Sequence, residues 1–481
     1  MGLPDWAEKQ RKPGVEIREQ RGQVYAYRVG SRYDPKAKRS RKITQEYLGK
    51  VTPDGIVPSK SRRRPKIQPI LEAGNIQLLK RLAAPLEEAL KPYWPRQWQT
   101  IIAAAALRMA YRCSLTNIAF HHDTSTSHHA WPDAHVSPDS MTRLLNDLGL
   151  DHGRIVEFYR SLHEEGAHLA VDLTHVMSDS RGIRWIERGY AGRGEPTRDV
   201  FQLFLVWNVR AHAPGFLKLL PGTVNSAAGL VDSVRESGLK DVVAVGDEGF
   251  YSAANLGSLE HAGVSYVVRA PRTQAFIPKL PESRFKQYVS WRKRPQWYVE
   301  TRILVVDDDG TRRDRRVVVF LDKQIRARQE AAFLDAVDEG RKHLKDLDAA
   351  RACFGVMGLI TDTELSPQEL WELYQGRAEI EEAFRALKGT LGADRSWMQS
   401  LESLHGFYFI LFLSLWLYSR VQQHLKRKRL TKKYSVHDIL LRLSKLHQVQ
   451  AGGEVWPVEP TKQTRDLAKA LEVSLTETSG N

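Results

Sequence analysis

The chain has 481 residues, 42% of them hydrophobic and 27% charged, which is ordinary for a globular protein and allows two to four domains. A formal net charge of +15 indicates a polyanionic partner, either nucleic acid or an anionic membrane surface. The only cysteines, Cys113 and Cys353, argue against a disulfide framework and favour a reducing cytoplasm.

A membrane location is not expected from the apolar segments. Residues 1–6 lack the apolar core of a signal peptide. Residues 405–419 are uncharged and apolar, but this stretch is shorter than the roughly 20 residues that a membrane span needs. We therefore expect a buried core helix at 405–419, which leaves nucleic acid as the favoured partner.

Residues 1–65 are basic and strand-like. The alternation of polar and apolar residues at 15–18 and 23–29 is typical of half-buried strands. Two basic clusters occur in this segment, and tyrosines are interleaved with them. The clusters include Arg62, Arg63 and Arg64, and the tyrosines are Tyr25, Tyr27, Tyr33 and Tyr47. This pattern predicts a small β-rich DNA-binding module along a phosphate backbone, and a solvated basic arm is the alternative.

Residues 66–165 form a region that we expect to be helical and to bind DNA. Its predicted helices cover residues 75–90, 97–112, 115–121, 138–148 and 153–165. The fourth begins at Ser137-Pro138 and resembles the second helix of a helix-turn-helix, with Ser140, Arg143 and Asn146 on its open side. Contact of Arg143 with DNA and plain packing of this helix both remain open. The irregular spacing of four histidines in 121–129 favours a solvated loop over a zinc site.

From residue 166 the pattern changes to strands alternating with helices. Strands are predicted at 168–176, 200–210, 241–247 and 264–269, with helices at 225–236 and 252–262. These segments, 166–270, would form the first part of an α/β core, and residues 355–450 the second part with C-terminal helices. Residues 451–481 are expected to be a polar, loosely ordered tail.

Residues 271–354 read as a β-rich insertion into that core. Strands are predicted at 296–306 and 315–321, followed by a charged helical stretch. Trp291 and Trp297 stand among cations, a combination that binds distorted or single-stranded nucleic acid by stacking. The alternative is that both tryptophans pack against the sheet of the insertion.

A helix at 366–388 carries the most informative spacing. Ser366, Pro367 and Glu369 form a helix start with a capping box. At about 100° per residue, four polar residues fall within an arc of roughly 60° on one face. These residues are Tyr374, Arg377, Glu381 and Lys388. The alternative is an amphipathic helix whose Arg377–Glu381 pair contributes a few tenths of a kcal/mol.

Two aspartates, Asp172 and Asp247, end apolar strand runs. Two-metal phosphoryl transfer needs carboxylates from separate segments to converge, and Glu381 on the late helix would be the third. Either aspartate taken alone equally suits a strand-end cap.

Together these motifs resemble those of the insertion-sequence DDE transposases. The resemblance is carried by Val171-Asp172-Leu-Thr, by Val245-Gly-Asp247-Glu-Gly-Phe, and by the spacing of Tyr374, Arg377, Glu381 and Lys388. It implies an α/β fold with an RNase H-like mixed sheet flanked by helices, a β-rich insertion, and N-terminal β-rich and helical DNA-binding regions.

The resemblance also implies a chemistry. Asp172, Asp247 and Glu381 would hold two Mg²⁺ ions, or Mn²⁺ ions in their place, while Tyr374, Arg377 and Lys388 would hold phosphates. The enzyme would act as a homodimer on double-stranded DNA in a prokaryotic cytoplasm, associated with the nucleoid. It would bind terminal inverted repeats, hydrolyse the strand at each end, and join the freed 3′-OH to target DNA. Some relatives hold a flipped base on a tryptophan of the insertion, as Trp291 or Trp297 would here. The alternatives are a nuclease of the same fold without strand transfer and a catalytically silent DNA-binding descendant.

Overall fold

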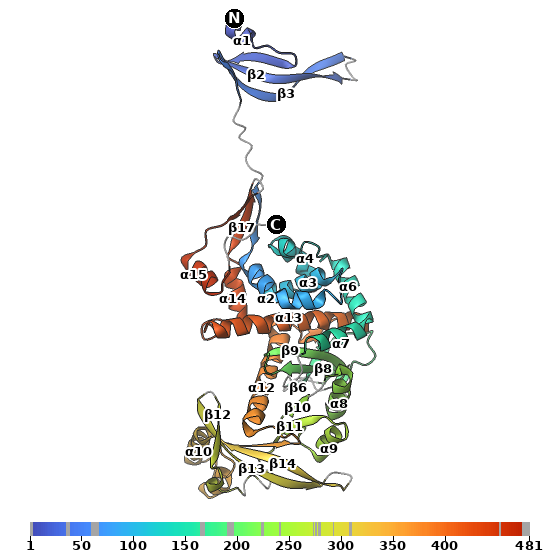
Figure 1. The fold of residues 1–481 in the computed structure, drawn as a ribbon, viewed down its shortest axis with the longest axis vertical. Coiled ribbons are helices and arrows are strands. Elements are labelled where there is room, and N and C mark those ends of the chain that lie inside the picture. The colour runs from blue at the N-terminus through green and yellow to red at the C-terminus, as the bar shows by residue number, and fades with distance from the viewer. Residues whose placement is uncertain are drawn as a thin grey trace. The chain divides into compact units, whose positions relative to one another are not determined.

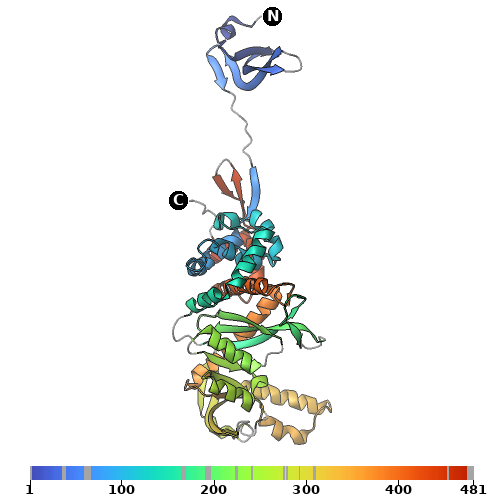
Figure 2. The same ribbon diagram turned by 90° about the vertical axis from the view of Figure 1, so that its right-hand side faces the viewer.

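The computed structural model describes the chain except residues 1–2, 35–38, 59–66, 164–168, 190–196, 223–225, 240–241, 273, 275–276, 278–279, 292, 307–309, 452–453 and 474–481. The chain divides into two compact units, one formed by residues 1–68 with 450–454 and the other by residues 69–449 with 455–481. Figures 1 and 2 show the elements of each unit.

The N-terminal unit is built on an antiparallel sheet in the order β1-β2-β3-β4. A short helix precedes it, and the elements are α1 (Asp5–Glu8), β1 (Val15–Gln20), β2 (Gln23–Asp34), β3 (Arg39–Thr52) and β4 (Gly55–Pro58). One face of the sheet buries a small core made by Ala7, Ile17, Val24, Ala26 and Val51. The β-rich architecture predicted for this segment is thus present, while Arg62, Arg63 and Arg64 lie outside the described residues.

The core of the second unit is a mixed sheet with the strand order β9-β8-β6-β10-β11. Its strands are β6 (Leu169–Ser178), β8 (Arg198–Asn208), β9 (Ala213–Pro221), β10 (Val243–Gly246) and β11 (Ser265–Ala270). The first three form an antiparallel meander. A parallel bridge between Leu169 and Val242 places β10 beside β6, and β11 continues parallel to β10. Helices α8 (Ser226–Ser237) and α9 (Ala253–His261) supply the connections. This is the RNase H-like mixed sheet expected from the sequence.

Strand β15 of the second part of the core, and the strands of the insertion beyond it, extend this sheet. Strand β11 pairs with β15 (Val356–Thr361), and β15 pairs with β14 (Arg312–Leu321), β14 with β13 (Arg294–Val306) and β13 with β12 (Gln287–Trp291), all antiparallel. Helices α10 (Lys323–Asp338) and α11 (Leu347–Arg351) follow β14. Two short strands are added at the meander: β7 (Glu187–Gly189) pairs with β8, and β16 (Arg395–Ser396) pairs with β6.

The helical region packs around one long helix, α13 (Leu401–Arg427), which lies beside α3, α6 and β9 (Figure 1). The other helices are α2 (Gly74–Leu90), α3 (Trp98–Tyr111), α4 (Ile118–Asp123), α5 (Ser127–Ala130), α6 (Pro138–Leu150), α7 (His152–Ser161) and α14 (Val436–Leu443). Helices α6 and α13 meet backbone to backbone: a Cβ atom on Gly406 would lie 2.1 Å from the carbonyl oxygen of Leu145.

Helix α13 is, in the described part of the chain, the one helix that is long and apolar enough to cross a membrane. This is weak evidence for a span, because 72% of its most apolar window is buried and core helices of soluble proteins pass the same test. Burial of the 405–419 stretch agrees with the core helix that we predicted there.

Two local predictions were wrong. The histidine-rich stretch is not a solvated loop but forms α4 and α5, where His122 is buried and His121 stacks on Tyr111 with ring centroids 4.0 Å apart. The C-terminal stretch is not loosely ordered up to residue 473, because it contains α15 (Lys462–Ala470), which buries Leu467 and Ala468. The remaining strands are β5 (Ile67–Glu72), β17 (His447–Ala451) and β18 (Glu454–Pro457).

Candidate active site

The central element of the candidate site is helix α12 (Pro367–Arg385). It begins as predicted, because the Ser366 side chain accepts from the Glu369 N–H and the Glu369 carboxylate accepts from the Ser366 N–H. Its apolar stripe, which includes Leu370, Leu373 and Ile380, is buried. Helix α12 lies against β6 of the core sheet (Figure 1).

The two aspartates are brought to the same region by neighbouring parallel strands. Asp172 lies on β6, opposite Leu205 of β8. Asp247 directly follows β10, and its Oδ1 accepts from the N–H groups of Gly249 and Phe250 at 3.0 and 3.2 Å. Because β6 and β10 are joined by a parallel bridge, the two carboxylates project from adjacent strands running in the same direction.

The Arg377 guanidinium contacts all three carboxylates. Its Nη1 lies 2.9 Å from Glu381 Oε1, and its Nη2 lies 3.1 Å from Asp247 Oδ2 and 4.0 Å from Asp172 Oδ2. The arginine side chain is 19% exposed, whereas Asp247 and Glu381 are about half exposed. Three acids from segments separated by more than 60 residues therefore converge around one cation.

The electrostatics of this cluster are dominated by Asp172. Burial raises the pKa of Asp172 to about 6, and the charges of Asp247 and Glu381 add to that effect. The nearby Arg377 acts in the opposite direction. Bringing another positive charge to this place would therefore be favourable, because it would stabilise the ionised form of Asp172.

The donor set is chemically suited to hard divalent cations. Carboxylate oxygens are the ligands that Mg²⁺ and Mn²⁺ prefer, and three negative charges here face one guanidinium. In the described part of the chain, no three His, Cys, Asp or Glu side chains yet stand in a geometry that could hold a metal ion. The carboxylates fit the metal on condition that Arg377, which lies between them, turns aside.

Tyr374 and Lys388, the other two residues predicted on this helix, have different surroundings. Tyr374 is only 8% exposed and belongs to the hydrophobic core. Lys388 lies in a π-helical turn, Ala386–Thr390, that follows α12, so the spacing of 100° per residue does not extend to it. Burial lowers the pKa of Lys388. Burial, with a smaller effect from the Lys388 charge, lowers the pKa of His175 on β6, which is consistent with a position of Lys388 beside that strand.

The rear of α12 carries an anchor that we did not predict from the sequence. The Glu379 carboxylate accepts from Trp207 Nε1 at 3.2 Å and contacts His212 Nδ1 at 2.7 Å. A Cβ atom on Gly376 would lie 2.7 Å from Val209 Cγ2, so the helix packs closely on the end of β8. These contacts fix α12 against the strand that pairs with the Asp172 strand.

The tryptophans of the insertion occupy different environments. Trp291 lines a cavity of about 510 Å³ together with Arg269, Arg272, Gln296 and Trp371. Gln296 is 3% exposed, and its Oε1 has no hydrogen-bond partner among the described residues, nor do Arg272 Nε and Trp371 Nε1. Trp297 instead lies under Lys323, whose Nζ is 4.7 Å from the ring centroid. One signal for this cavity is visible in the sequence, because Trp371 stands one turn before Tyr374.

The predicted DNA contact of α6 is only partly supported by its geometry. Arg143 is exposed, and its Nε lies 3.4 Å from the carbonyl oxygen of Asp139 in its own helix. Asn146 is not on the open side, because its Oδ1 accepts from Ser403 of α13 at 2.6 Å. The apolar face of α6 packs on α13, so only its outer edge remains available.

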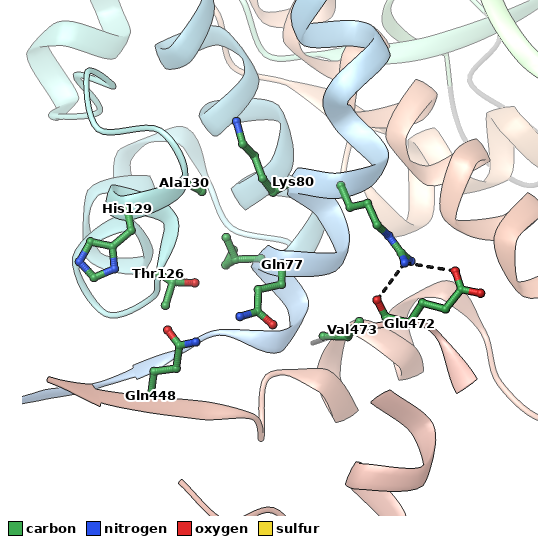
Figure 3. Close-up of a pocket in the computed structure, with 10 residues that line it drawn as sticks. Gln77, Lys80, Thr126, His129, Ala130, Gln448, Glu472 and Val473 are labelled. Carbon is green, nitrogen blue, oxygen red and sulfur yellow. Dashed lines mark hydrogen bonds and ion pairs between the residues drawn. The ribbon is translucent and has the colours of Figure 1, made fainter. Parts of the chain in front are cut away.

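Another cavity, of about 360 Å³, lies between α2, α5 and the C-terminal segment (Figure 3). Gln77, Thr126 and Gln448 line it, and on its far side Arg81 donates to the backbone oxygen and the carboxylate of Glu472 at 2.9 and 3.3 Å. None of the residues lining this cavity belongs to the carboxylate cluster.

Comparison with known proteins identifies the family. The family model described as the transposase DDE domain matches residues 164–417, more than half of the chain, and this range contains all three carboxylates. No curated protein sequence matches the chain.

Two solved structures are similar to it at low scores. A piggyBac transposase synaptic complex with hairpin DNA has 12% identity and a TM-score of 0.36 over 73% of this chain and 70% of that one. A Mos1 transposase paired-end complex with the left transposon end has 14% identity and a TM-score of 0.13 over 36% and 59%. The assignment rests on the family match, by which the chain belongs to the family of transposases with a DDE domain.

Proposed function

We propose that the chain is an active DNA transposase whose catalytic residues are Asp172, Asp247 and Glu381. The observation that carries this proposal is the contact of the Arg377 guanidinium with all three carboxylates. The family match supports a DNA-transposing enzyme, and the convergence of the three acids supplies the site at which strand cleavage would occur.

Asp172, Asp247 and Glu381 would hold two Mg²⁺ ions, or Mn²⁺ in their place. When bound, a pair of divalent cations activates the attacking oxygen and stabilises the leaving oxygen of a phosphodiester. Asp247 is held for this role by the two N–H groups that its Oδ1 accepts from, which leaves Oδ2 directed toward the cluster.

Arg377 would change partners during the reaction. In the structure it compensates the three carboxylates, and cations bound there would release its guanidinium to a DNA phosphate, for which it is well suited geometrically. Lys388 would hold a second phosphate beside β6. Tyr374 would contribute only if its hydroxyl reaches the surface, since the side chain is largely buried.

Trp291 is the better candidate for contact with a displaced base. Within the described part of the chain, polar atoms of Gln296, Arg272 and Trp371 in its cavity have no hydrogen-bond partner, as a base with donors and acceptors requires. Trp297 does not line this cavity, and Lys323 Nζ lies 4.7 Å from its ring centroid.

The proposed partners are double-stranded DNA of the element ends and of the target. The net charge of +15 supports such a partner, and the two structural neighbours are described as complexes with DNA. We further propose a homodimer that pairs two ends, acting in the cytoplasm of a prokaryote at the nucleoid. The same fold would also serve a nuclease without strand transfer or a silent DNA-binding descendant.

A cleavage assay separates these functions. Linear DNA carrying the element's own ends is incubated with the protein and Mg²⁺ in the presence of target DNA. Ends joined to target indicate a transposase, cuts without joining indicate a nuclease, and a mobility shift without cuts indicates a binding protein.

The variant Glu381→Ala tests the site within that assay. It is expected to abolish cutting and to leave the mobility shift unchanged. Glu372→Ala is the matched control, because Glu372 is an exposed carboxylate on the same helix that pairs with Gln368 outside the cluster. Cutting that survives Glu381→Ala would refute the assignment.

A further inference from the structure

The outer face of the N-terminal sheet carries three tyrosines close together. In β2, Val24 and Ala26 point into the small core, so the alternating Tyr25 and Tyr27 lie on the opposite face. The strand register places Tyr47 of β3 directly opposite Tyr27. The sheet therefore turns one apolar face inward and one aromatic face outward.

These rings surround a hollow instead of packing flat on one another. The Tyr47 ring centroid lies 5.9 Å from that of Tyr25 and 5.3 Å from that of Tyr27, with interplanar angles of 59° and 49°. The shallow hollow has a volume of about 800 Å³, and its remaining lining residues are Gln20, Arg21 and Gln23. Tyr47 is 41% exposed, so ring surface is open to a ligand.

The charges around the hollow favour an anionic ligand. Among the described residues that line it none is acidic, and Lys50 stands opposite Tyr25 in the register. The nearby Glu16 is already engaged by Arg18 at 2.7 Å and Lys42 at 3.1 Å. A cationic ligand would meet Arg18, whose guanidinium lies 5.0 Å from the Tyr27 ring centroid.

The turn at the rim of the hollow is strained at Arg21, which carries a cationic side chain. Gln20 and Gln23 pair across a two-residue turn in which Arg21 has φ +53° and Gly22 has φ +73°. Asn or Asp is the usual residue at the first position of such a turn, because both central residues need positive φ. Strain of this kind commonly marks a functional position, and here it holds Arg21 at the edge of the aromatic hollow.

We propose that this face binds unpaired DNA, with bases stacked on Tyr25, Tyr27 and Tyr47 and phosphates contacted by Arg21 and Lys50. Base faces are available for stacking only where the strand is unpaired, since a duplex would engage the rim cations and leave the rings unused. The inference rests on the proposed function for its DNA partner, and it adds that the N-terminal module recognises single-stranded or melted DNA.

The test uses the full chain and fluorescein-labelled oligonucleotides of about 15 nucleotides, single-stranded or duplex, in anisotropy titrations over a range of salt concentrations. Tyr47→Leu is expected to weaken single-strand binding roughly 5- to 150-fold while leaving its salt dependence unchanged. Tyr47→Phe, which keeps the ring, is expected to bind nearly as the wild type does. Arg21→Gln is expected to reduce the logarithmic salt slope by about 0.7.

Tyr33→Leu is the matched control, because Tyr33 lies in the same sheet on β2, is 60% exposed and does not line the hollow. The proposal is overturned if Tyr47→Leu behaves as Tyr33→Leu does, or if it weakens duplex binding as much as single-strand binding.

A second measurement does not depend on whether Tyr47→Leu folds. Ultraviolet crosslinking of wild-type protein to single strands containing bromodeoxyuridine is expected to label the peptides that carry Tyr25, Tyr27 or Tyr47, and labelling confined to other peptides would overturn the proposal. End cleavage that fails in the wild type would refute the proposed function alone, whereas normal cleavage without single-strand preference would refute only this inference.

Discussion

Removing the Arg377 guanidinium is expected to strengthen metal binding while impairing cleavage. In the structure this cation lies at 2.9, 3.1 and 4.0 Å from the three carboxylates, in the space where a metal ion would need to approach. Arg377→Gln keeps an unbranched stem that ends in a polar group, shorter than arginine by two atoms, and removes the charge. The ligands for the metal remain, and the cation that competes with it is gone.

The size of the effect follows from the same distances. Two unit charges 4 Å apart interact by about 1 kcal/mol in bulk water, so a divalent ion and the guanidinium repel each other by about 2 kcal/mol before salt screening. Because two of the carboxylates are about half exposed, we use the aqueous value and expect about 1–2 kcal/mol. This corresponds to a roughly 5- to 30-fold lower dissociation constant for the divalent ion.

The measurement is a titration of free Mn²⁺ by electron paramagnetic resonance, with the DNA cleavage rate followed in parallel. Arg385→Gln is the control, since Arg385 is an exposed arginine on the same helix without a contact to the carboxylates. If Arg377→Gln weakened Mn²⁺ binding as much as Glu381→Ala does, Arg377 would be organising the site and not competing with the metal, and this reasoning would be wrong.

Three further outcomes are expected. Gly406→Ala is expected to lower stability by about 1–3 kcal/mol, because its Cβ would overlap the Leu145 carbonyl, while Gly153→Ala, with open space around it, is expected to be neutral or stabilising in thermal melts. Burial and the neighbouring His152 lower the pKa of His405 to about 4, so the unfolded state, with an ordinary pKa of 6.5, binds the proton more readily. Unfolding experiments are therefore expected to show stability that is full above pH 6.5 and falls by up to about 3 kcal/mol toward pH 4, a loss that His405→Gln removes. Burial raises the pKa of Asp172 to about 6, so Mn²⁺ affinity is expected to fall as the pH drops through about 6, and Asp172→Asn is expected to flatten that dependence.

Much of the α/β core could be predicted because its signals are local. Helix α12 has a capping box and a regular apolar stripe, and both aspartates follow apolar runs that form β6 and β10. Strand β9 was not predicted, because Pro214, Gly215 and Pro221 interrupt its apolar pattern. In the structure it nevertheless pairs with β8 over most of its length. The order of β6 and β10 in the sheet is a tertiary property that no single segment encodes.

The features that the sequence did not reveal depend on contacts between distant segments. The position of Arg377 among three carboxylates requires α12, β6 and β10 to be assembled first. The π-helical turn at Lys388 alters a spacing that looks regular in the sequence. Asn146 appears solvent-facing on an isolated helix, and only the crossing of α6 with α13 shows that it is a hydrogen-bond acceptor in a packed interface.

The central claim is that segments near Asp172, Asp247 and Glu381 share one metal site, and Fe²⁺-directed cleavage of the polypeptide tests it most directly. Fe²⁺ bound at oxygen ligands in place of Mg²⁺ generates hydroxyl radicals with ascorbate and peroxide, and these cut only the backbone nearby. The account predicts cuts at all three segments together, suppressed by excess Mg²⁺ and lost in Glu381→Ala. Cuts at only one segment, or a pattern that Glu381→Ala leaves unchanged, would contradict it.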